Sequence, residues 1–412
     1  MGWKSNREVT LLNQKISNIA YSNGNVEDLG YFLCDNGNVS NFIISGGVTS
    51  DERYEVVSQL LYSEIGKMPM VILHNEDIHI EAMVIQAWQS TNAQTPLWVV
   101  NNRNAEFEPF YGMNEMQVVT TFRQLAVKLN YTVTPRFERV IRAHLMILKE
   151  LDIPVSLSGL YYLCGFYDMG EFHDNVMALP CGESVARRIW ADLGVNSDDG
   201  NSQFDLFRAV VNNLANEAEQ SGWNPDNNIS EYNCLKILEA GGTLVLSVND
   251  MYTDLLMSYL LQELKTNRER QFVLLLDNIK VNDEYFQEYL RNTSSGCICG
   301  VIAENVVEMV GGDESNFLRF VERMDSIVLF KHSTGKTALT LSEIFGKYDY
   351  TKLEVSRGTN KRFFDLLPTG RHDDMRYSTE NRYRVMPEEI IALRAGQAIV
   401  FDLSRDQIIH FN

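Results

Sequence analysis

The triplet Gly335-Lys336-Thr337 is the first feature of the sequence whose residue types could do chemistry. It follows an apolar run at 325–331 and precedes a segment with the apolar spacing of a helix. In a phosphate-binding loop, G-x-x-x-x-G-K-[ST], backbone N–H groups cradle the phosphates, the lysine contacts the β and γ groups, and the hydroxyl holds Mg²⁺. The leading glycine would stand at position 330, which is Phe330. We therefore interpret the triplet as an ordinary turn between a strand and a helix.

A second stretch, NFIISGGVTSDERYEVVSQLL at 41–61, has the same order of strand, glycine-rich turn and helix. Aligned to the motif, Gly46 is the first glycine, and Asp51, Glu52 and Arg53 stand where the second glycine, the lysine and the hydroxyl residue belong. Two carboxylates there would repel a triphosphate, each close contact costing on the order of a few kcal/mol at an effective dielectric of about 20. The vestigial loop predicted from this alignment comprises Gly46, Gly47, Val48, Thr49, Ser50, Asp51, Glu52 and Arg53.

The partner motif of such a site is an apolar strand that ends in an acidic residue. RQFVLLLDNI at 270–279 ends in this way, with Asp277 at the position that binds Mg²⁺ through water. An acidic residue usually follows and activates the attacking water, but here the next residue is Asn278, which cannot act as a base. The two motifs occur in the right order and with the right flanks, which favours a degenerate nucleotide site over two unrelated turns.

Short apolar runs that alternate with helical segments predict a parallel α/β sheet. We expect strands at 41–46, 67–75, 95–102, 241–248, 270–277, 296–303, 325–331 and 396–403. Between about 115 and 235, apolar residues instead recur at spacings of three and four, which is typical of helices. The predicted architecture is a RecA-like α/β domain made of residues 1–114 and 236–412, with an all-α domain, residues 115–235, inserted into it.

Charge and cysteine spacing exclude several other functions. The net charge of −19 argues against broad binding of nucleic acid, which requires a basic surface. The basic stretch at 357–384 is interleaved with acids and aromatics, and we interpret it as a solvated loop. The six cysteines lack zinc-ligand spacing, so we expect reduced structural cysteines and no metal. No run of about 20 apolar residues predicts a transmembrane segment, and the N-terminus lacks the apolar core of a signal peptide.

These motifs carry a resemblance to the type IV coupling proteins, the TraG/TraD-like branch of the FtsK–HerA family of DNA-pumping ATPases. Residues 28–47 resemble the lead-in strands and phosphate loop of that family, and 67–77 the strand that follows. The turn at 107–112 is similar to the one before the all-α domain of the family. Segments 241–248, 272–279, 296–305, 325–346 and 382–402 resemble the later strands and the closing segment. The resemblance covers most of the chain and places the triplet at 335–337 after a late strand, away from the nucleotide loop.

The departures from the family pattern concern the chemistry of the site. The lysine of the loop and the catalytic acid are absent, and the sensor glutamine expected after the strand at 296–303 is replaced by Glu304 or Asn305. We also expect no counterpart of the N-terminal membrane helices that many coupling proteins have. The resemblance thus implies a nucleotide site without catalytic residues, and neither a cofactor nor a metal is expected.

Three functions are compatible with this sequence. The leading hypothesis is a catalytically inactive subunit of a conjugation or type IV secretion apparatus, cytoplasmic or held at the inner face of the membrane by partners. It would form homo- or hetero-oligomers, recruit a protein substrate or relaxosome, and meet DNA only indirectly. One alternative is an active ATP-driven DNA translocase, with ATP and Mg²⁺ as cofactors and Arg53 or Lys336 contacting phosphate. The other is an ATPase-derived scaffold of a defence or regulatory complex.

Overall fold

The structure is a computed structural model of the 412-residue chain. The residues that it describes are 6–21, 29–34, 41–75, 77–101, 107–111, 113–165, 169–179, 182–193, 198–220, 234–248, 253, 255–261, 271–280, 298–310, 314–359 and 371–411.

The centre of the molecule is a 10-stranded sheet with the order β1-β12-β11-β8-β2-β7-β6-β3-β5-β4. Its strands are β1 (Ile19–Tyr21), β2 (Phe42–Ser45), β3 (Met70–His74), β4 (Leu97–Val100), β5 (Thr243–Ser247), β6 (Val273–Asp277), β7 (Ile298–Ala303), β8 (Ser326–Leu329), β11 (Ala398–Asp402) and β12 (Gln407–Phe411). All pairs are parallel except those that β11 makes with β8 and β12. The predicted α/β fold with a mostly parallel sheet is therefore confirmed.

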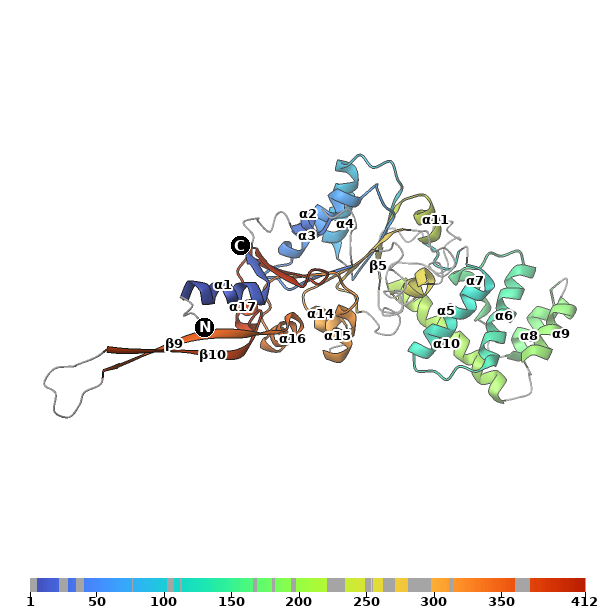
Figure 1. The fold of residues 1–412 in the computed structure, drawn as a ribbon. Helices are drawn as coiled ribbons and strands as arrows, with labels where there is room; N and C mark the ends of the chain where they lie inside the picture. Colours follow the sequence, from blue (N-terminus) through green and yellow to red (C-terminus); the bar gives the residue numbers. More distant parts are fainter. Residues whose placement is uncertain are drawn as a thin grey trace.

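The central strands are buried and mostly apolar because both faces of the sheet are covered. In β2, Phe42 and Ile44 join one core cluster, whereas Ile43 joins the other. The first cluster lies under helices α2 (Leu29–Cys34), α3 (Asp51–Glu64) and α4 (Ile78–Ser90). The opposite face carries α14 (Val306–Met309), α15 (Glu314–Val321) and α16 (Gly335–Phe345), as Figure 1 shows.

Strands from the two halves of the chain interleave in this sheet. β2 lies between β7 and β8, and β3 lies between β5 and β6. The carboxyl ends of these parallel strands therefore meet at one edge of the sheet, where residues distant in sequence become neighbours. This edge holds the loop after β2 and the end of β6, which are the two motifs singled out in the sequence.

A helical lobe lies beyond the β4 side of the sheet (Figure 1). It consists of α5 (Glu115–Lys128), α6 (Pro135–Glu150), α7 (Leu157–Leu163), α8 (Met169–Met177), α9 (Gly182–Leu193) and α10 (Asp198–Gln220), and α11 (Cys234–Glu239) then leads back to β5. Local signals start these helices: Asn114 and Gln117 form a capping box at α5, and Pro135 is the first residue of α6. Among the described residues, no helix has the length and hydropathy needed to cross a bilayer.

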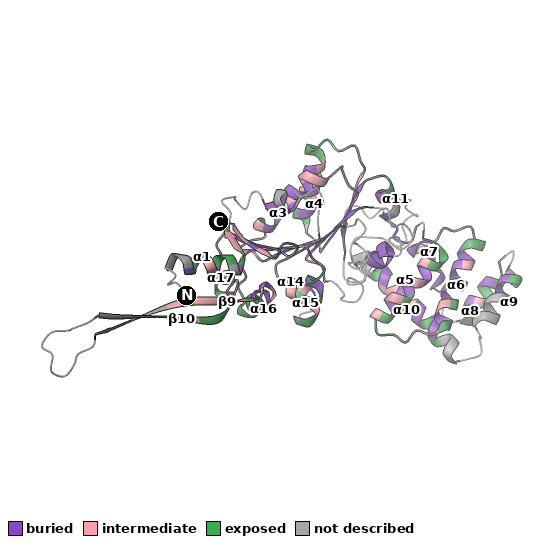
Figure 2. Cartoon of the chain, viewed as in Figure 1, coloured by how far each residue is buried: buried purple, intermediate pink, exposed green. Residues whose placement is uncertain are grey.

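Burial is continuous between the lobe and the sheet, as the purple interior of both in Figure 2 illustrates. Phe110 stacks on Phe122, whose ring contacts the tilted ring of Phe207, and their cluster extends to strand residues such as Leu246. The carboxylate of Glu108 also joins the two parts, because it accepts N–H groups from Phe110 and from Leu157, each at 3.0 Å. Where the lobe would separate as an independent domain stays a prediction.

A long antiparallel hairpin corrects one interpretation. β9 (Lys347–Thr359) pairs with β10 (Arg371–Tyr383) and projects from the body at the end opposite the lobe (Figure 1). The interpretation of 357–384 as a solvated loop was therefore wrong for 357–359 and 371–383, and residues 360–370 lie outside the described part of the chain. Near its base the hairpin is held by cross-strand pairs instead of a core, with Lys347 over the ring of Tyr383 and Arg382 over the ring of Tyr350. The sequences of β9 and β10 therefore lack the alternation of apolar and polar residues by which strands are predicted.

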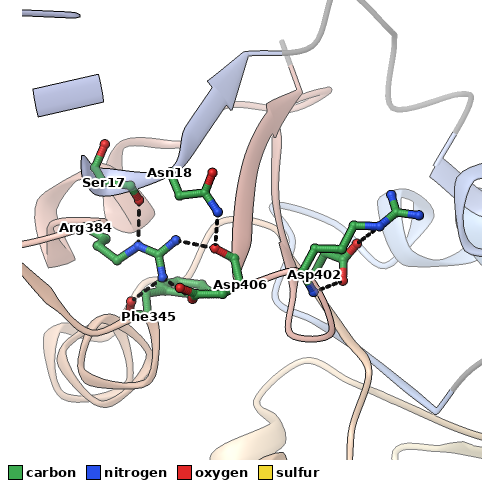
Figure 3. Close-up of polar contacts among 7 residues, drawn as sticks. Ser17, Asn18, Phe345, Arg384, Asp402 and Asp406 are labelled. Carbon is green, nitrogen blue, oxygen red and sulfur yellow. Dashed lines mark hydrogen bonds and ion pairs between the residues drawn. The ribbon is translucent and has the colours of Figure 1, made fainter. Parts of the chain in front are cut away.

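Arg384, the residue after β10, fastens the hairpin to the rest of the molecule. Figure 3 shows its guanidinium donating to the carbonyl of Ser17 at 2.7 Å, to the carboxylate of Asp406 at 2.5 Å and to the Asp406 carbonyl at 2.7 Å. A longer bond reaches the carbonyl of Phe345, and the side chain is only 9% exposed. One residue thereby connects the end of α1 (Asn6–Ser17), the end of α16 and the turn between β11 and β12.

Replacing Arg384 with methionine should lower the free energy of unfolding by about 3 kcal/mol. The carbonyls of Ser17 and Phe345, which lie near the core, would lose a charged donor. Arg384→Lys is the matched control: it keeps the charge but not the planar fork, so it should recover only part of the loss. Urea denaturation followed by circular dichroism measures both. Equal stability of the Met variant and the unmodified protein would show that these bonds contribute nothing net.

Candidate functional site

The loop after β2 is bonded to its neighbouring strands through the N–H groups of its two glycines. Gly46 and Gly47 have φ of +90° and +128°, which only glycine adopts readily. The Gly46 N–H donates to the carbonyls of Ala303 and Glu304 at 3.2 and 3.1 Å, and the Gly47 N–H donates to the Lys331 carbonyl at 2.9 Å. Two N–H groups at the start of the loop are therefore already used within the protein.

Glu52 supplies an internal anion to the same loop. One carboxylate oxygen accepts the N–H of Val48 at 2.6 Å, and the other accepts the N–H of Gly396 at 3.1 Å. Glu52 is in the first turn of α3, where a negative charge is favoured by the helix dipole. Its carboxylate thus accepts the Val48 N–H, and in a phosphate loop a backbone N–H of this kind donates to a phosphate oxygen. Asp51 makes a long contact of 3.4 Å with the hydroxyl of Thr49.

Arg53 is turned inward, under the loop. It is 5% exposed, and its Nη1 donates to the Gly46 carbonyl at 2.5 Å. Its Nε has no hydrogen-bond partner among the described residues. The guanidinium therefore fixes the glycine turn from inside and does not point to solvent, where a ligand would arrive.

The end of β6 is equally enclosed. Asp277 is fully buried, and its Oδ2 has no hydrogen-bond partner in the described part of the chain. Burial first and the charge of Asp77 second raise the pKa of Asp277, to about 7, against the opposing charge of Arg53 and the hydrogen bond from Asn278. Asn278 donates to Asp277 Oδ1 at 3.3 Å and accepts the Glu304 N–H at 3.3 Å. Asn278 thus connects β6 to β7 and offers no basic group.

Two histidines lie beside these motifs and are neutral. His74 is paired in register with Asp277, and its Nδ1 accepts the Asp77 N–H at 2.9 Å. Burial lowers its pKa to about 4, so its 3.5 Å contact with Glu81 is not an ion pair at neutral pH. His332 lies against Gly46, and burial first and Arg53 second lower its pKa to about 4. Arg53 is therefore the cation within this group.

Glu304 and Asn305, the predicted sensor position, follow β7, and Asn305 contacts the triplet at 335–337 at the start of α16. Asn305 donates to the Glu308 carboxylate at 2.7 Å and to the Thr337 hydroxyl at 3.2 Å, whereas Glu304 is exposed. Gly335 and Lys336 begin α16 and are exposed, and Thr337 is buried beneath them. The triplet thus forms the first turn of the helix after β8 and is separate from the loop after β2.

Several residues of this site were not singled out in the sequence as site residues: Tyr54, Asp77, His332 and Gly396. Tyr54 donates its hydroxyl to Asp77, and Asp77 also caps α4 by accepting the His79 N–H at 2.8 Å. No short motif marks these residues, because strand pairing and long-range loop contacts bring them to the edge of the sheet.

The residues present do not fit a nucleoside triphosphate and Mg²⁺. The N–H groups of Gly46, Gly47 and Val48 have internal acceptors, and a carboxylate lies where an anionic ligand would bind. Asp277 has no access to solvent, and Lys336 belongs to the neighbouring connection.

Gly46→Ala should disrupt this loop. A Cβ atom there would lie 2.8 Å from the carbonyls of Phe330 and Lys331 and from Nε2 of His332, at a φ that strains any L-residue. We expect a loss of about 3 kcal/mol in the free energy of unfolding. Gly335→Ala is the control, since no atom lies within 4 Å of its added Cβ and alanine favours helices. Thermal unfolding of both variants measures the difference, and a Gly46 variant as stable as the control would contradict the described loop.

No protein-family model matches the sequence, and no curated protein matches it either. Solved structures do match. The bacterial conjugative coupling protein TrwBdeltaN70, in its unbound form, superposes with a TM-score of 0.58 at 13% identity, covering 90% of this chain and 83% of that one. TrwB in complex with ADP and Mg²⁺ gives 0.52 at 14% identity, covering 90% and 84%. VirB4 of Thermoanaerobacter pseudethanolicus gives 0.50 at 10% identity, covering 92% and 90%.

These likenesses extend over most of each chain, yet the sequences have diverged almost completely. They concern the three-dimensional fold and not the residues of the site. The resemblance to type IV coupling proteins predicted from the sequence is confirmed at this level: the chain has the RecA-like fold that TrwB and VirB4 share.

Proposed function

We propose that this chain is a non-hydrolysing, coupling-protein-like subunit of a conjugation or type IV secretion apparatus. The observation that carries the proposal is the Glu52 carboxylate, which accepts the Val48 N–H inside the loop where related folds bind phosphate. The fold supports the place in the apparatus, since TrwB is a conjugative coupling protein by its description. The contacts of Glu52 in the loop support the second part of the proposal, that the chain does not hydrolyse ATP.

In this role the protein is structural or recruits substrates. The RecA-like body forms rings or mixed oligomers with itself or with an active relative. Residues 115–235 act as an inserted recruiting domain for a protein substrate or a relaxosome. With a net charge of −19, the chain contacts DNA through these partners. It works in the cytoplasm or at the inner face of the membrane.

Purification of the tagged full chain from its native host, after chemical cross-linking, tests this role. We expect cross-links to subunits of a conjugation or secretion apparatus, including an active coupling ATPase. Cross-links confined to defence or regulatory proteins would favour the scaffold alternative. ATP-dependent movement along DNA by the purified chain alone would establish the translocase alternative and overturn the proposal.

A further inference from the structure

The hairpin of β9 and β10 stands out from the rest of the molecule as a sheet of only two strands. Its register is unbroken from the pair Lys347–Tyr383 to the pair Thr359–Arg371. It projects away from the central sheet and its helices (Figure 1). A hairpin of two strands is at best marginally stable in water unless a third strand or a helix packs against it. The projecting hairpin therefore gains stability from any neighbour that covers its edges.

The outer edge of β9 has such a neighbour in α1. The side chain of Asn13 donates to the carbonyl of Thr351 and accepts its N–H, both at 2.9 Å, as a paired strand would. The backbone groups of Thr351 thus point away from β10. At the base of the hairpin, the Arg384 N–H donates across to the Gly346 carbonyl at 3.0 Å. Odd-numbered residues of the hairpin therefore direct their backbone groups outward, and even-numbered residues direct theirs inward.

The outer edge of β10 has no neighbouring strand in the described part of the chain. Thr351 pairs with Thr379, so the N–H and carbonyl groups of Thr379 and of Asn381 point to this edge. Both residues are exposed. Proline and bulges, which commonly protect edge strands, are absent from β10. The edge can therefore accept another strand.

The charges along β10 are complementary to themselves. Arg376, Ser378 and Glu380 share one face of the strand, and Arg376 and Glu380 are exposed. When two copies of β10 run antiparallel with Ser378 opposite Ser378, Arg376 of each copy lies opposite Glu380 of the other. A two-fold axis at Ser378 forms this favourable pair twice. An axis at Arg376 or at Glu380 would instead place two like charges opposite each other.

The same charges select among possible partners. A uniformly acidic strand would be repelled by Glu380, and a uniformly basic strand would be repelled by Arg376. A fitting strand presents both signs with the spacing that β10 itself has. A second copy of this chain therefore matches the edge.

We propose that two copies of the chain pair through the β10 edges of their hairpins, antiparallel about Ser378, and form a sheet of four strands. Backbone groups of Thr379 and Asn381 bond to the second copy, and Arg376 of each copy pairs with Glu380 of the other. This contact lies outside the RecA-like body and goes beyond the proposed function, which it neither requires nor tests.

Mixing two charge-reversed variants of the full chain tests the pairing. Arg376→Glu places two carboxylates at each contact, and Glu380→Arg places two guanidinium groups there. Each variant alone should therefore dimerise about tenfold more weakly than the unmodified chain. An equimolar mixture should recover the original affinity, because every contact between the two variants again joins a carboxylate to a guanidinium group. Sedimentation velocity between about 1 and 100 µM measures the dimer.

Lys67→Glu is the matched control for these reversals, since Lys67 is an exposed cation on the turn between α3 and β3. It should leave the dimer unchanged. Circular dichroism and thermal unfolding check that every variant keeps its fold.

Ser378→Cys provides a second readout that leaves the charges in place. Cα atoms of an antiparallel pair without mutual hydrogen bonds lie about 4.5 Å apart, which a disulfide can span. Mild oxidation should therefore join two copies of this variant covalently, as seen on a non-reducing gel. Thr379→Cys is the control and should not be joined, because position 379 faces position 377 in this register. The unmodified chain, with its six cysteines, gives the background.

Three results would overturn the proposal. The first is an unmodified chain that stays monomeric up to about 100 µM. The second is a dimer that either charge reversal leaves unchanged or that the mixture fails to recover. The third is a Ser378→Cys variant that is joined no more than the background.

Discussion

The triple variant Asp51→Gly, Glu52→Lys, Arg53→Thr should bind ATP–Mg²⁺ with a dissociation constant of about 100 µM, at least tenfold tighter than the unmodified chain. Removing Glu52 frees the Val48 N–H, and the new lysine and threonine supply the cation and the hydroxyl of a phosphate loop. The gain is limited because the N–H groups of Gly46 and Gly47 stay bonded to neighbouring strands. Titration calorimetry measures the constant.

The same variant should hydrolyse ATP at background rate, even with Asn278→Glu added. Hydrolysis requires an activated, in-line water and usually an arginine from a neighbouring subunit, none of which these changes provide. Asp51→Gly alone is the control, and it should not bind, because the Glu52 carboxylate remains in the loop. Brisk turnover by the monomeric triple variant would show that the site is one step from an active one. Absence of binding would show that the loop backbone has diverged as well.

Glu108→Gln should make the protein more stable at pH 8 by up to about 3 kcal/mol, while changing little at pH 4.5. Burial raises the pKa of Glu108 to about 7, although the Phe110 and Leu157 N–H groups oppose the shift. Because the folded-state pKa lies above the ordinary value of 4.5, the fold favours the protonated carboxyl. Its stabilising contribution is complete below about pH 4.5 and is lost as the pH rises through 7.

The glutamine keeps an acceptor oxygen for these two N–H groups but cannot ionise, so the variant should lose this part of the pH dependence. Urea denaturation at pH 5, 6, 7 and 8 gives the free energy of unfolding of each protein. Glu138→Gln serves as the control, since Glu138 lies on α6 with a partly exposed carboxylate. A Glu108 variant whose stability follows the pH exactly as the parent does, or falls below it at pH 8, would contradict a raised pKa.

The strands of the sheet were predictable because both faces are buried. Runs such as MVILH in β3 and VLLLD in β6 are apolar up to their last residue, which is polar and lies at the edge where the motifs meet. Short strands at the ends of the chain were missed: β1 has three residues, and β12 is only partly buried. The hairpin was missed because cross-strand pairs at its base replace a core.

The place of these residues at the edge of the sheet was predictable, but their contacts were not. Spacing aligned Glu52 with the missing lysine, and we expected its charge to repel a ligand. That its carboxylate would bind the loop itself depends on Gly396, which is 344 positions away in the chain. The inward direction of Arg53 depends likewise on the path of Gly46. Local patterns carry no information about such contacts, because they arise from strand order and register.

Titration of the unmodified full chain with ATP and Mg²⁺ in a calorimeter tests the central claim most directly. The bound Glu52 carboxylate, the committed N–H groups of Gly46 and Gly47 and the enclosed Asp277 predict no heat of binding up to about 1 mM nucleotide. A dissociation constant in the micromolar range would show that the loop opens for a nucleotide and would contradict the account.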